Sequence, residues 1–332
     1  MPTHVPLSVL DLVPVSQGSS TQDALETSMQ AARSADRLGY NRVWYAEHHN
    51  TAHLGASATA VLIGRSAALT ERIRVGSGGV MLPNHAPLRV AEEFGTLAQF
   101  YPDRIDLGLG RAPGTDRMTA DLLSRSSAEP QAFATHVYDL TGWFGKEGTG
   151  HSVPVSGGVS AGTDVPLWIL GSTVNGASIA GQLGLPFSLA SHFAPGQMHE
   201  ALEVYRSSFD PSAPTAQIDK PYVMAGINVV IAPTDDEAQR LWTTPQRMMI
   251  DVRTGNRRPL QPPVEPDAVP ERERQFAESM LGVKAVGSPD TARADLEKFV
   301  ETTGVDELIT VTYTHDPADR MRSLELLAEL WF

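Results

Sequence analysis

The sequence repeats one pattern eight times, in which a short apolar run is followed by a longer segment with helical periodicity. The apolar runs are predicted strands at residues 6–12, 42–46, 73–82, 104–109, 166–170, 186–190, 222–231 and 307–312. Predicted helices lie at 21–38, 57–69, 87–100, 130–144, 174–182, 196–208, from 234, 289–303 and 317–330. Regular alternation is typical of both doubly wound sheets and barrels. The count of eight favours an α/β fold of the (β/α)8 type, a TIM barrel.

Two long segments interrupt this alternation. One spans 112–165, after the fourth strand, and the other spans 250–285, after the seventh helix. Within the second, residues 253–271 are rich in Pro and Arg and are predicted to form a loop. No stretch has the composition of a linker, so we expect a single domain over 1–332. Both insertions are candidate lids over the barrel mouth.

The composition excludes several classes of function. The chain of 332 residues has no Cys, which rules out disulfides, thiolate metal sites and a cysteine nucleophile. A net charge of −13 argues against nucleic acid as a partner. The N-terminus lacks a secretory signal, and no apolar run approaches the roughly 20 residues of a membrane helix. We therefore expect a cytoplasmic protein that does not associate with membranes.

In a TIM barrel the chemistry takes place at the carboxyl ends of the strands. The second strand ends in Glu47-His48-His49, three adjacent ionisable side chains that would be costly to bury without partners. A surface turn is the alternative interpretation of this cluster. The other strand ends add Asp11, Gly78-Gly79, Gly110-Arg111, Gly171-Ser172 and His192 as candidates, with Asp11 and His192 assigned to a substrate pocket.

Two of these strand ends are suited to an anion. Arg111 could bind one directly, although a structural ion pair is the alternative. Ser172 and Thr173 open a helix whose free N–H groups favour phosphate, or they simply cap that helix, and Asn175 could add a donor. Gly78-Gly79 and Gly110 would let a flat ligand approach the backbone, whereas a tight bend is the other explanation of the paired glycines.

Other motifs point away from their usual functions. The glycines of Gly108-Leu-Gly110 do not have the dinucleotide-binding spacing and follow the fourth strand rather than the first. His49 and His53 could share a metal, but no HExxH motif occurs, so we expect no metal.

Three segments together resemble the bacterial luciferase-like family of flavin-dependent monooxygenases. They are RVWYAEHH, then IRVGSGGVMLPNHAPLRVAEEFGTLAQFYPDRIDLGLGRAPGTD, and finally GSPDTARADLEKFVETTGVDELITVTYTHDPADR. The resemblance implies a TIM-like barrel, a homodimer, and reduced FMN that reacts with O2 through a flavin C4a-(hydro)peroxide to oxygenate a small organic substrate. It also implies a separate flavin reductase.

The resemblance assigns roles residue by residue. His48 matches the histidine that acts near the flavin and substrate, and Glu47 matches its acidic neighbour. Gly78-Gly79 matches a position where the family often has a non-proline cis peptide under the flavin ring. Arg111 and Ser172 match phosphate contacts, with Thr173 and Asn175 nearby. Gly110 and Gly171 replace bulkier residues of the luciferases proper, which favours the non-luminescent branch.

Three alternatives to this function stay open. A deazaflavin-dependent oxidoreductase would share the fold, a flavin-binding protein without turnover would share the cofactor site, and a metal hydrolase would share neither cofactor nor reaction. For the dimer, small and apolar residues such as Ala60, Ala67 and Ala91 in the predicted helices 57–69 and 87–100 would allow packing across a two-fold axis, although core packing explains them equally well.

Overall fold

Eight parallel strands close into a barrel in the computed structural model, which describes residues 4–112, 114–123 and 130–332. The barrel strands are β1 (Leu7–Asp11), β2 (Arg42–Tyr45), β3 (Arg74–Ser77), β5 (Ile105–Gly110), β6 (Leu167–Gly171), β7 (Phe187–Leu189), β8 (Val223–Ile231) and β10 (Glu307–Val311). They are hydrogen-bonded in this order, and β10 pairs with both β8 and β1, which closes the ring. The predicted TIM barrel is therefore confirmed, including all eight predicted strands.

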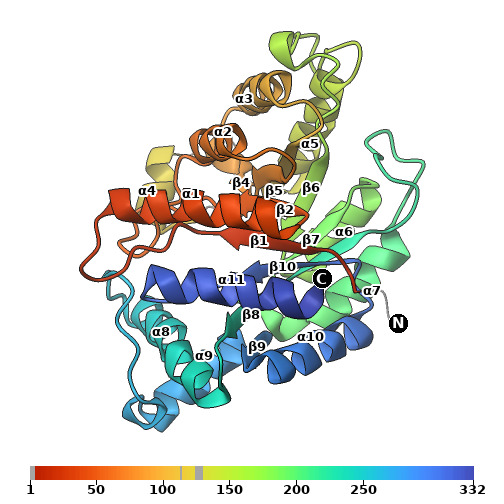
Figure 1. Ribbon diagram of the computed structural model, residues 1–332. Coiled ribbons are helices and arrows are strands. Elements are labelled where there is room, and N and C mark those ends of the chain that lie inside the picture. Colours follow the sequence, from red (N-terminus) through yellow and green to blue (C-terminus); the bar gives the residue numbers. More distant parts are fainter. Residues whose placement is uncertain (1–3, 113, 124–129) are drawn as a thin grey trace.

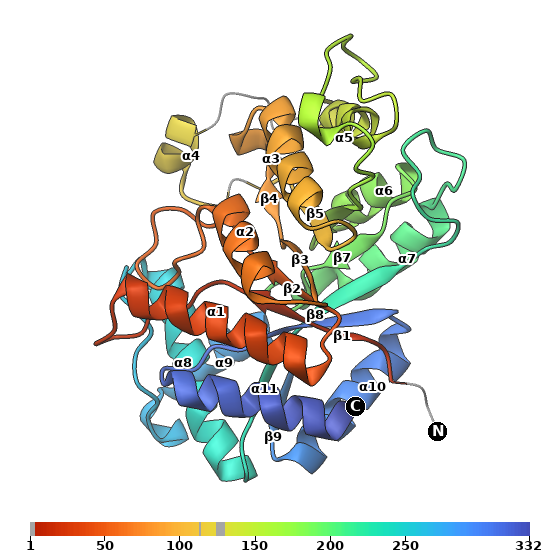
Figure 2. The same cartoon turned by 45° about the horizontal axis from the view of Figure 1, so that its top comes forward.

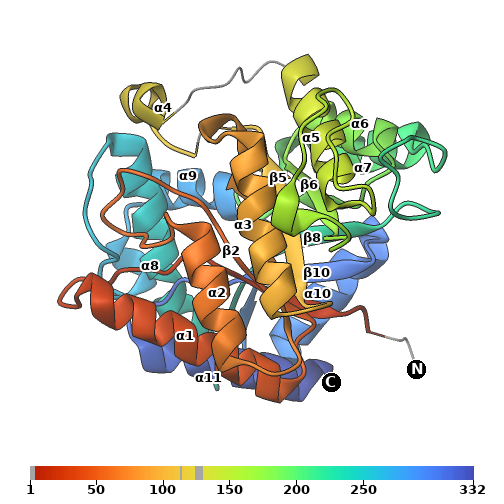
Figure 3. The ribbon, with the colours of Figure 1, turned by 90° about the horizontal axis from the view of Figure 1, so that it is seen from above.

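Helices surround the barrel (Figures 1 and 3). The outer layer consists of α1 (Thr21–Leu38), α2 (Thr59–Leu69), α3 (Pro87–Phe100), α5 (Pro130–Phe144), α6 (Val174–Gln182), α7 (Met198–Ser208), α10 (Pro289–Thr303) and α11 (Pro317–Trp331). Local signals set these boundaries: Ser20 forms a capping box with Asp23 at the start of α1, and Gly39 ends that helix with φ of 90°.

The predicted third strand, 73–82, is interrupted by a backbone feature that the sequence pattern did not show. β3 ends at Ser77, a cis peptide joins Gly78 to Gly79, and a separate strand β4 (Val80–Met81) pairs with β5. Space is short here, since a β-carbon on Gly79 would lie 2.8 Å from the carbonyl oxygen of Gly108. The cis peptide stands where the family resemblance implied one.

The predicted loop at 253–271 is confirmed over 255–270, which holds one 3-10 turn at Pro266–Ala268, while the rest of the segment 250–285 contains regular structure. α8 (Asp235–Thr254) extends into it, and α9 (Glu271–Leu281) and β9 (Lys284–Gly287) follow. These elements bury a small core of their own, made of Val230, Ala232, Ala238, Leu241, Trp242, Leu281 and Val286. Periodicity did not reveal α9 because its sequence, ERERQFAESML, is largely polar.

The other insertion, 112–165, holds the predicted helix α5 and, among its described residues, one further α-helix and a 3-10 turn at Gly158–Ser160. This short helix, α4 (Arg117–Leu123), lies on the side of the molecule opposite the two chain ends (Figures 1 and 2). Residues 113 and 124–129 of this insertion lie outside the described residues.

A charged network fills the amino-terminal end of the barrel interior. Arg42 contacts Asp106 at 2.7 Å and Glu307 at 2.8 Å, and its own exposure is only 7%. Arg74 also contacts Asp106, at 2.6 Å, and the Tyr222 hydroxyl donates to Glu307 at 3.0 Å. Two arginines thus face two carboxylates, so the buried charges balance.

No helix of the described residues is long and apolar enough to cross a membrane.

Candidate active site

Glu47, directly after β2 and its neighbour Ala46, is buried and binds four groups with its carboxylate. Its Oε1 accepts from Nε2 of His49 and of His85, both at 2.9 Å, and from Asn84 Nδ2 at 3.3 Å. Its Oε2 accepts from the backbone N–H of Met81 at 2.9 Å. The carboxylate therefore holds together the end of β2 and the segment that follows the cis peptide.

The negative charge of Glu47 and the positive charge of His85 stabilise each other. Burial alone would raise the pKa of Glu47, but the hydrogen bond and charge of His85, together with His49 and Met81, bring that pKa below its usual value. The hydrogen bond to Glu47 raises the pKa of His85, against the effect of its partial burial. An ionised carboxylate only accepts hydrogen bonds, so His85 donates from Nε2.

The cluster predicts a pH-dependent contribution of His85 to stability. Because the pKa of His85 is higher in the folded state, its pairing with Glu47 stabilises the fold fully below the unfolded pKa of about 6.5 and loses that effect as pH rises through the folded value. We expect His85→Gln to lower the melting temperature more at pH 5.5 than at pH 8.5. The exposed His199, replaced in the same way, should show no such difference; an equal loss at both pH values would contradict the pairing.

The geometry favours a positioning role for Glu47 over the catalytic role expected from the sequence. Its oxygens are committed to His49, His85, Asn84 and Met81, and of these only His49 belonged to the cluster singled out in the sequence. His85 had no signal of its own beyond its place in the family-like segment.

His48 follows Glu47 and carries the ring best suited to proton transfer. Burial lowers its pKa, an effect that the Gly114 carbonyl and the Glu47 charge partly oppose. Its backbone N–H donates to the carbonyl of Ala56 at 2.7 Å, which fixes the loop after β2. A neutral imidazole near pH 7 can accept a proton, as a general base requires.

Arg111 and Asn175 meet at the ends of neighbouring strands, as the phosphate hypothesis requires. With its amide oxygen directed at Arg111, Asn175 accepts from both terminal guanidinium nitrogens, at 2.9 and 3.1 Å. Thr173 is the N-cap of α6 and accepts from the Gly176 N–H at 3.3 Å, while Ser172 is half-buried beside it. The N-terminus of α6 and one guanidinium thus lie together, which is a favourable setting for an anion.

Each of the glycines at these strand ends is required by a different close contact. A β-carbon on Gly78 would lie 2.5 Å from a Leu10 methyl group, and one on Gly110 would lie 2.8 Å from the Met81 sulfur. Gly171 approaches the α-carbon of Gly176, so a side chain there would crowd the start of α6. At Gly78, Gly79 and Gly110 the space that a side chain would need is thus already filled by neighbouring protein atoms.

The two residues assigned to a substrate pocket differ in their surroundings. Asp11 is fully buried, and its carboxylate accepts from the Val13 N–H at 2.7 Å and the Ser28 hydroxyl at 2.6 Å. Arg320 pairs with it at 3.0 Å. Asp11 thus faces the helical layer, so its expected contact with substrate does not fit the structure; His192, at the end of β7, remains a candidate.

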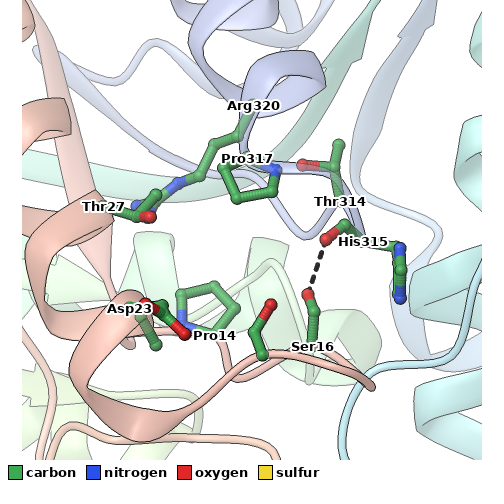
Figure 4. Close-up of a pocket in the computed structure, with 10 residues that line it drawn as sticks. Pro14, Ser16, Asp23, Thr27, Thr314, His315, Pro317 and Arg320 are labelled. Carbon is green, nitrogen blue, oxygen red and sulfur yellow. Dashed lines mark hydrogen bonds between the residues drawn. The ribbon is translucent and has the colours of Figure 1, made fainter.

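Arg320 also borders a small cavity between the loops that follow β1 and β10 (Figure 4). Its volume is about 20 Å³, enough for about one water molecule. The Ser16 hydroxyl donates to the His315 carbonyl at 2.6 Å across its edge. A cavity of this size is too small for a flavin or an organic substrate.

No cluster of three or more His, Asp or Glu suited to a metal ion occurs among residues 4–112, 114–123 and 130–332.

Comparison with known proteins places this arrangement in a family. Residues 5–307 match the sequence profile of the family described as luciferase-like monooxygenase. A luciferase-like monooxygenase of Escherichia coli (strain K12) is 41% identical over 98% of this chain and 97% of its own length. The crystal structure of apo-MsnO8 is 36% identical, with a TM-score of 0.86 over 99% of this chain and 98% of its own.

A more distant structure shares the fold. The oxygenating constituent of 3,6-diketocamphane monooxygenase from Pseudomonas putida, solved with FMN, is 18% identical, with a TM-score of 0.74 over 98% of this chain and 97% of its own. The family match over most of the chain and the E. coli relative together carry the assignment. The chain is therefore an oxidoreductase that belongs to the luciferase-like monooxygenase family.

Proposed function

We propose that this protein is an FMN-dependent monooxygenase that uses reduced FMN and O2 to oxygenate a small organic substrate. The meeting of Arg111 and Asn175 at the start of α6, together with the cis peptide Gly78-Gly79 between β3 and β4, carries the proposal. A cofactor with a flat ring and a phosphate needs an anion site and a place for the ring that lie one or two strands apart. The FMN complex of the structurally similar diketocamphane enzyme supports the choice of cofactor.

The residues present fit FMN. Arg111, Ser172, Thr173 and the N-terminus of α6 would hold the phosphate, and the ring would lie against the backbone at the cis peptide Gly78-Gly79. Bound in its reduced form, FMN would supply the electrons that activate O2. His48 would move a proton at its ring nitrogen, and Glu47 would keep the segment after the cis peptide in place through Met81 and His85.

The two insertions are proposed to shield the site from water. Asp116, just before α4, accepts from Asn50 at 2.7 Å and pairs with Arg257 at 3.2 Å. These contacts join both insertions to the loop after β2. Leu260 is buried and its N–H donates to the Val15 carbonyl at 2.8 Å, which anchors the second insertion beside β1. Exclusion of water is what an oxygen-activating flavin site requires.

A homodimer, a separate flavin reductase and a cytoplasmic location complete the proposal. For the dimer, Val61 on α2 is 71% exposed and Phe100 on the adjacent α3 is 73% exposed. Such apolar side chains on neighbouring helices suit a contact with a second copy.

Sedimentation analysis is expected to give twice the monomer mass for the wild-type protein. Val61→Glu is expected to reduce the measured mass to that of the monomer.

Loss of the Arg111 guanidinium should weaken FMN selectively. We expect Arg111→Ala to raise the Kd of FMN about 10- to 100-fold, because a charge-assisted hydrogen bond contributes about 1.5–3 kcal/mol. Riboflavin lacks the phosphate, so its Kd should change less than threefold. Fluorescence titration of both flavins measures this, and an equal loss for the two would exclude the phosphate role.

The proposed activity is tested by oxygen uptake with reduced FMN and a panel of aldehydes, ketones and aromatic compounds. We expect organic product in amounts that exceed the uncoupled release of hydrogen peroxide. Binding without any product would favour a non-catalytic flavin-binding protein. Selective binding of a deazaflavin and hydride transfer to substrate would favour the other oxidoreductase.

A further inference from the structure

His192 faces the His48 side of the barrel from the opposite wall. It follows β7, and in the closed order β1-β2-β3-β5-β6-β7-β8-β10 the strands β7 and β2 are diametrically opposed. The side chain is well buried, with 7% of the residue exposed. His48, which follows β2, therefore lies on the wall opposite His192.

The orientation of the His192 ring follows from its contact with β8. A β-carbon on Gly226 would lie 2.2 Å from Nδ1 and 3.1 Å from both Cγ and Cε1. The Nδ1 corner of the ring therefore points at Gly226. The opposite edge, which carries Nε2, points away from β8. Glycine at position 226 is what allows the ring to lie this close to the strand.

The same contact selects one tautomer of His192. Nδ1 is fully buried and has no hydrogen-bond partner. A proton there would be a buried N–H without an acceptor, which proteins strongly avoid. The proton of the neutral ring therefore belongs on Nε2.

The backbone around His192 is held firmly. The Asn228 amide donates to the His192 carbonyl at 2.5 Å, and the Ser191 hydroxyl donates to the Gly226 carbonyl at 2.7 Å. Burial, with a smaller effect of His48, lowers the pKa of His192 to about 3. The backbone is thus fixed on both sides of the ring, and burial favours the uncharged form of the ring.

We propose that His192 is a second substrate-contacting residue, which donates a hydrogen bond from Nε2 to an acceptor oxygen of an uncharged substrate such as an aldehyde or ketone. The inference rests on the proposed function and deepens it. An uncharged donor stabilises a carbonyl oxygen without attracting carboxylates or sulfonates, so it sets a preference for neutral acceptors. His48 on the opposite wall stays free for proton transfer.

The tautomer is tested by nitrogen NMR of the full chain labelled in its histidine rings, without flavin. We expect one ring to remain neutral and protonated at Nε2 from pH 5 to pH 8. Its signals should vanish in His192→Gln and persist in the control His199→Gln on the exposed start of α7. A ring protonated at Nδ1, or one that titrates in this range, would overturn the proposal.

The contact is tested with n-decanal, 2-decanone and cyclohexanone as probes, added to the FMN-loaded protein. At least one probe should shift the Nε2 resonance. Gln places an amide nitrogen where Nε2 lies, so His192→Gln should keep the Kd of that probe within about threefold. Asn places its amide near Nδ1, so His192→Asn should raise that Kd by about three- to tenfold. Gly226→Ala, which displaces the ring, should match the Asn variant.

Two outcomes of the probe experiment would overturn the contact: no probe shifts Nε2, or the Gln and Asn variants lose affinity equally. Melting temperatures of all variants separate a lost contact from a lost fold. A parallel titration of the wild-type protein with FMN identifies failure of the proposed function. The tautomer measurement needs no flavin, so it remains decisive for His192 in that case.

Discussion

Replacing Arg42 with Met is expected to lower the free energy of unfolding by about 3–5 kcal/mol. Arg42 is 7% exposed and contacts the carboxylates of Asp106 and Glu307, both of which are fully buried. Methionine fills a similar volume but leaves Asp106 with Arg74 as its ion-pair partner and removes the cation that contacts the buried Glu307. A complete buried ion network contributes little to the free energy of unfolding. Removing one partner lowers that free energy strongly, because the remaining buried charges are no longer compensated. Urea unfolding followed by circular dichroism measures the change.

Arg89 provides a matched control for Arg42. It also pairs with an acid, Glu93, at 2.8 Å, but its side chain is 70% exposed on the surface of α3. Arg89→Met should therefore change the free energy of unfolding by at most about 0.5 kcal/mol. A loss below 1 kcal/mol for Arg42→Met would show that water reaches the barrel interior and screens the charges.

Replacing His48 with Gln is expected to lower substrate oxygenation by about 10²- to 10⁴-fold, the range that a general acid or base contributes. Burial holds the pKa of His48 below its usual value, so the neutral ring is available at pH 7. Because that pKa is lowered, the rate of the wild-type protein should fall on the acid side of the ordinary histidine pKa, where the ring gains its proton. The residual rate of the variant should lack this acid limb. FMN affinity should stay within about twofold.

His53 is the matched control for His48. It lies on the same loop, burial lowers its pKa as well, and its ring lies 2.9 Å from the Thr51 hydroxyl. His53→Gln should change the oxygenation rate less than tenfold. Product formed per reduced FMN consumed, with the substrate that the panel selects, is the quantity to compare. Similar losses in both variants would indicate that the loop as a whole matters, and the assignment of His48 would fail.

Much of the fold could be predicted because the signals that specify it are local. Helix α1 begins after Ser20 and ends before Gly39, in agreement with the predicted range 21–38. α9 was missed for an equally local reason, because it follows a Pro-rich stretch and is largely polar. The strand ends at the barrel mouth followed from counting strands, and this located His48 and Arg111 correctly at that end.

Side-chain direction could not be predicted in the same way. Asp11 ends a strand at the mouth, yet its carboxylate faces the helices and pairs with Arg320 from the last helix. Side chains alternate between the two faces of a strand. This alternation does not determine on which face the side chain of the last residue lies, because the loop that follows can change its direction. The partner of Asp11 is also more than three hundred positions away along the chain, where no local pattern connects the two.

By itself, the sequence determined the order and type of the elements and the set of residues delivered to the barrel mouth, since periodicity and strand count suffice for both. Only the tertiary structure decided which groups touch. It joined Glu47 to His85, Arg111 to Asn175, and turned the Nδ1 corner of His192 toward Gly226. These pairings depend on which strands lie side by side or opposite one another, and on differences of a few tenths of an ångström between residues far apart in the chain.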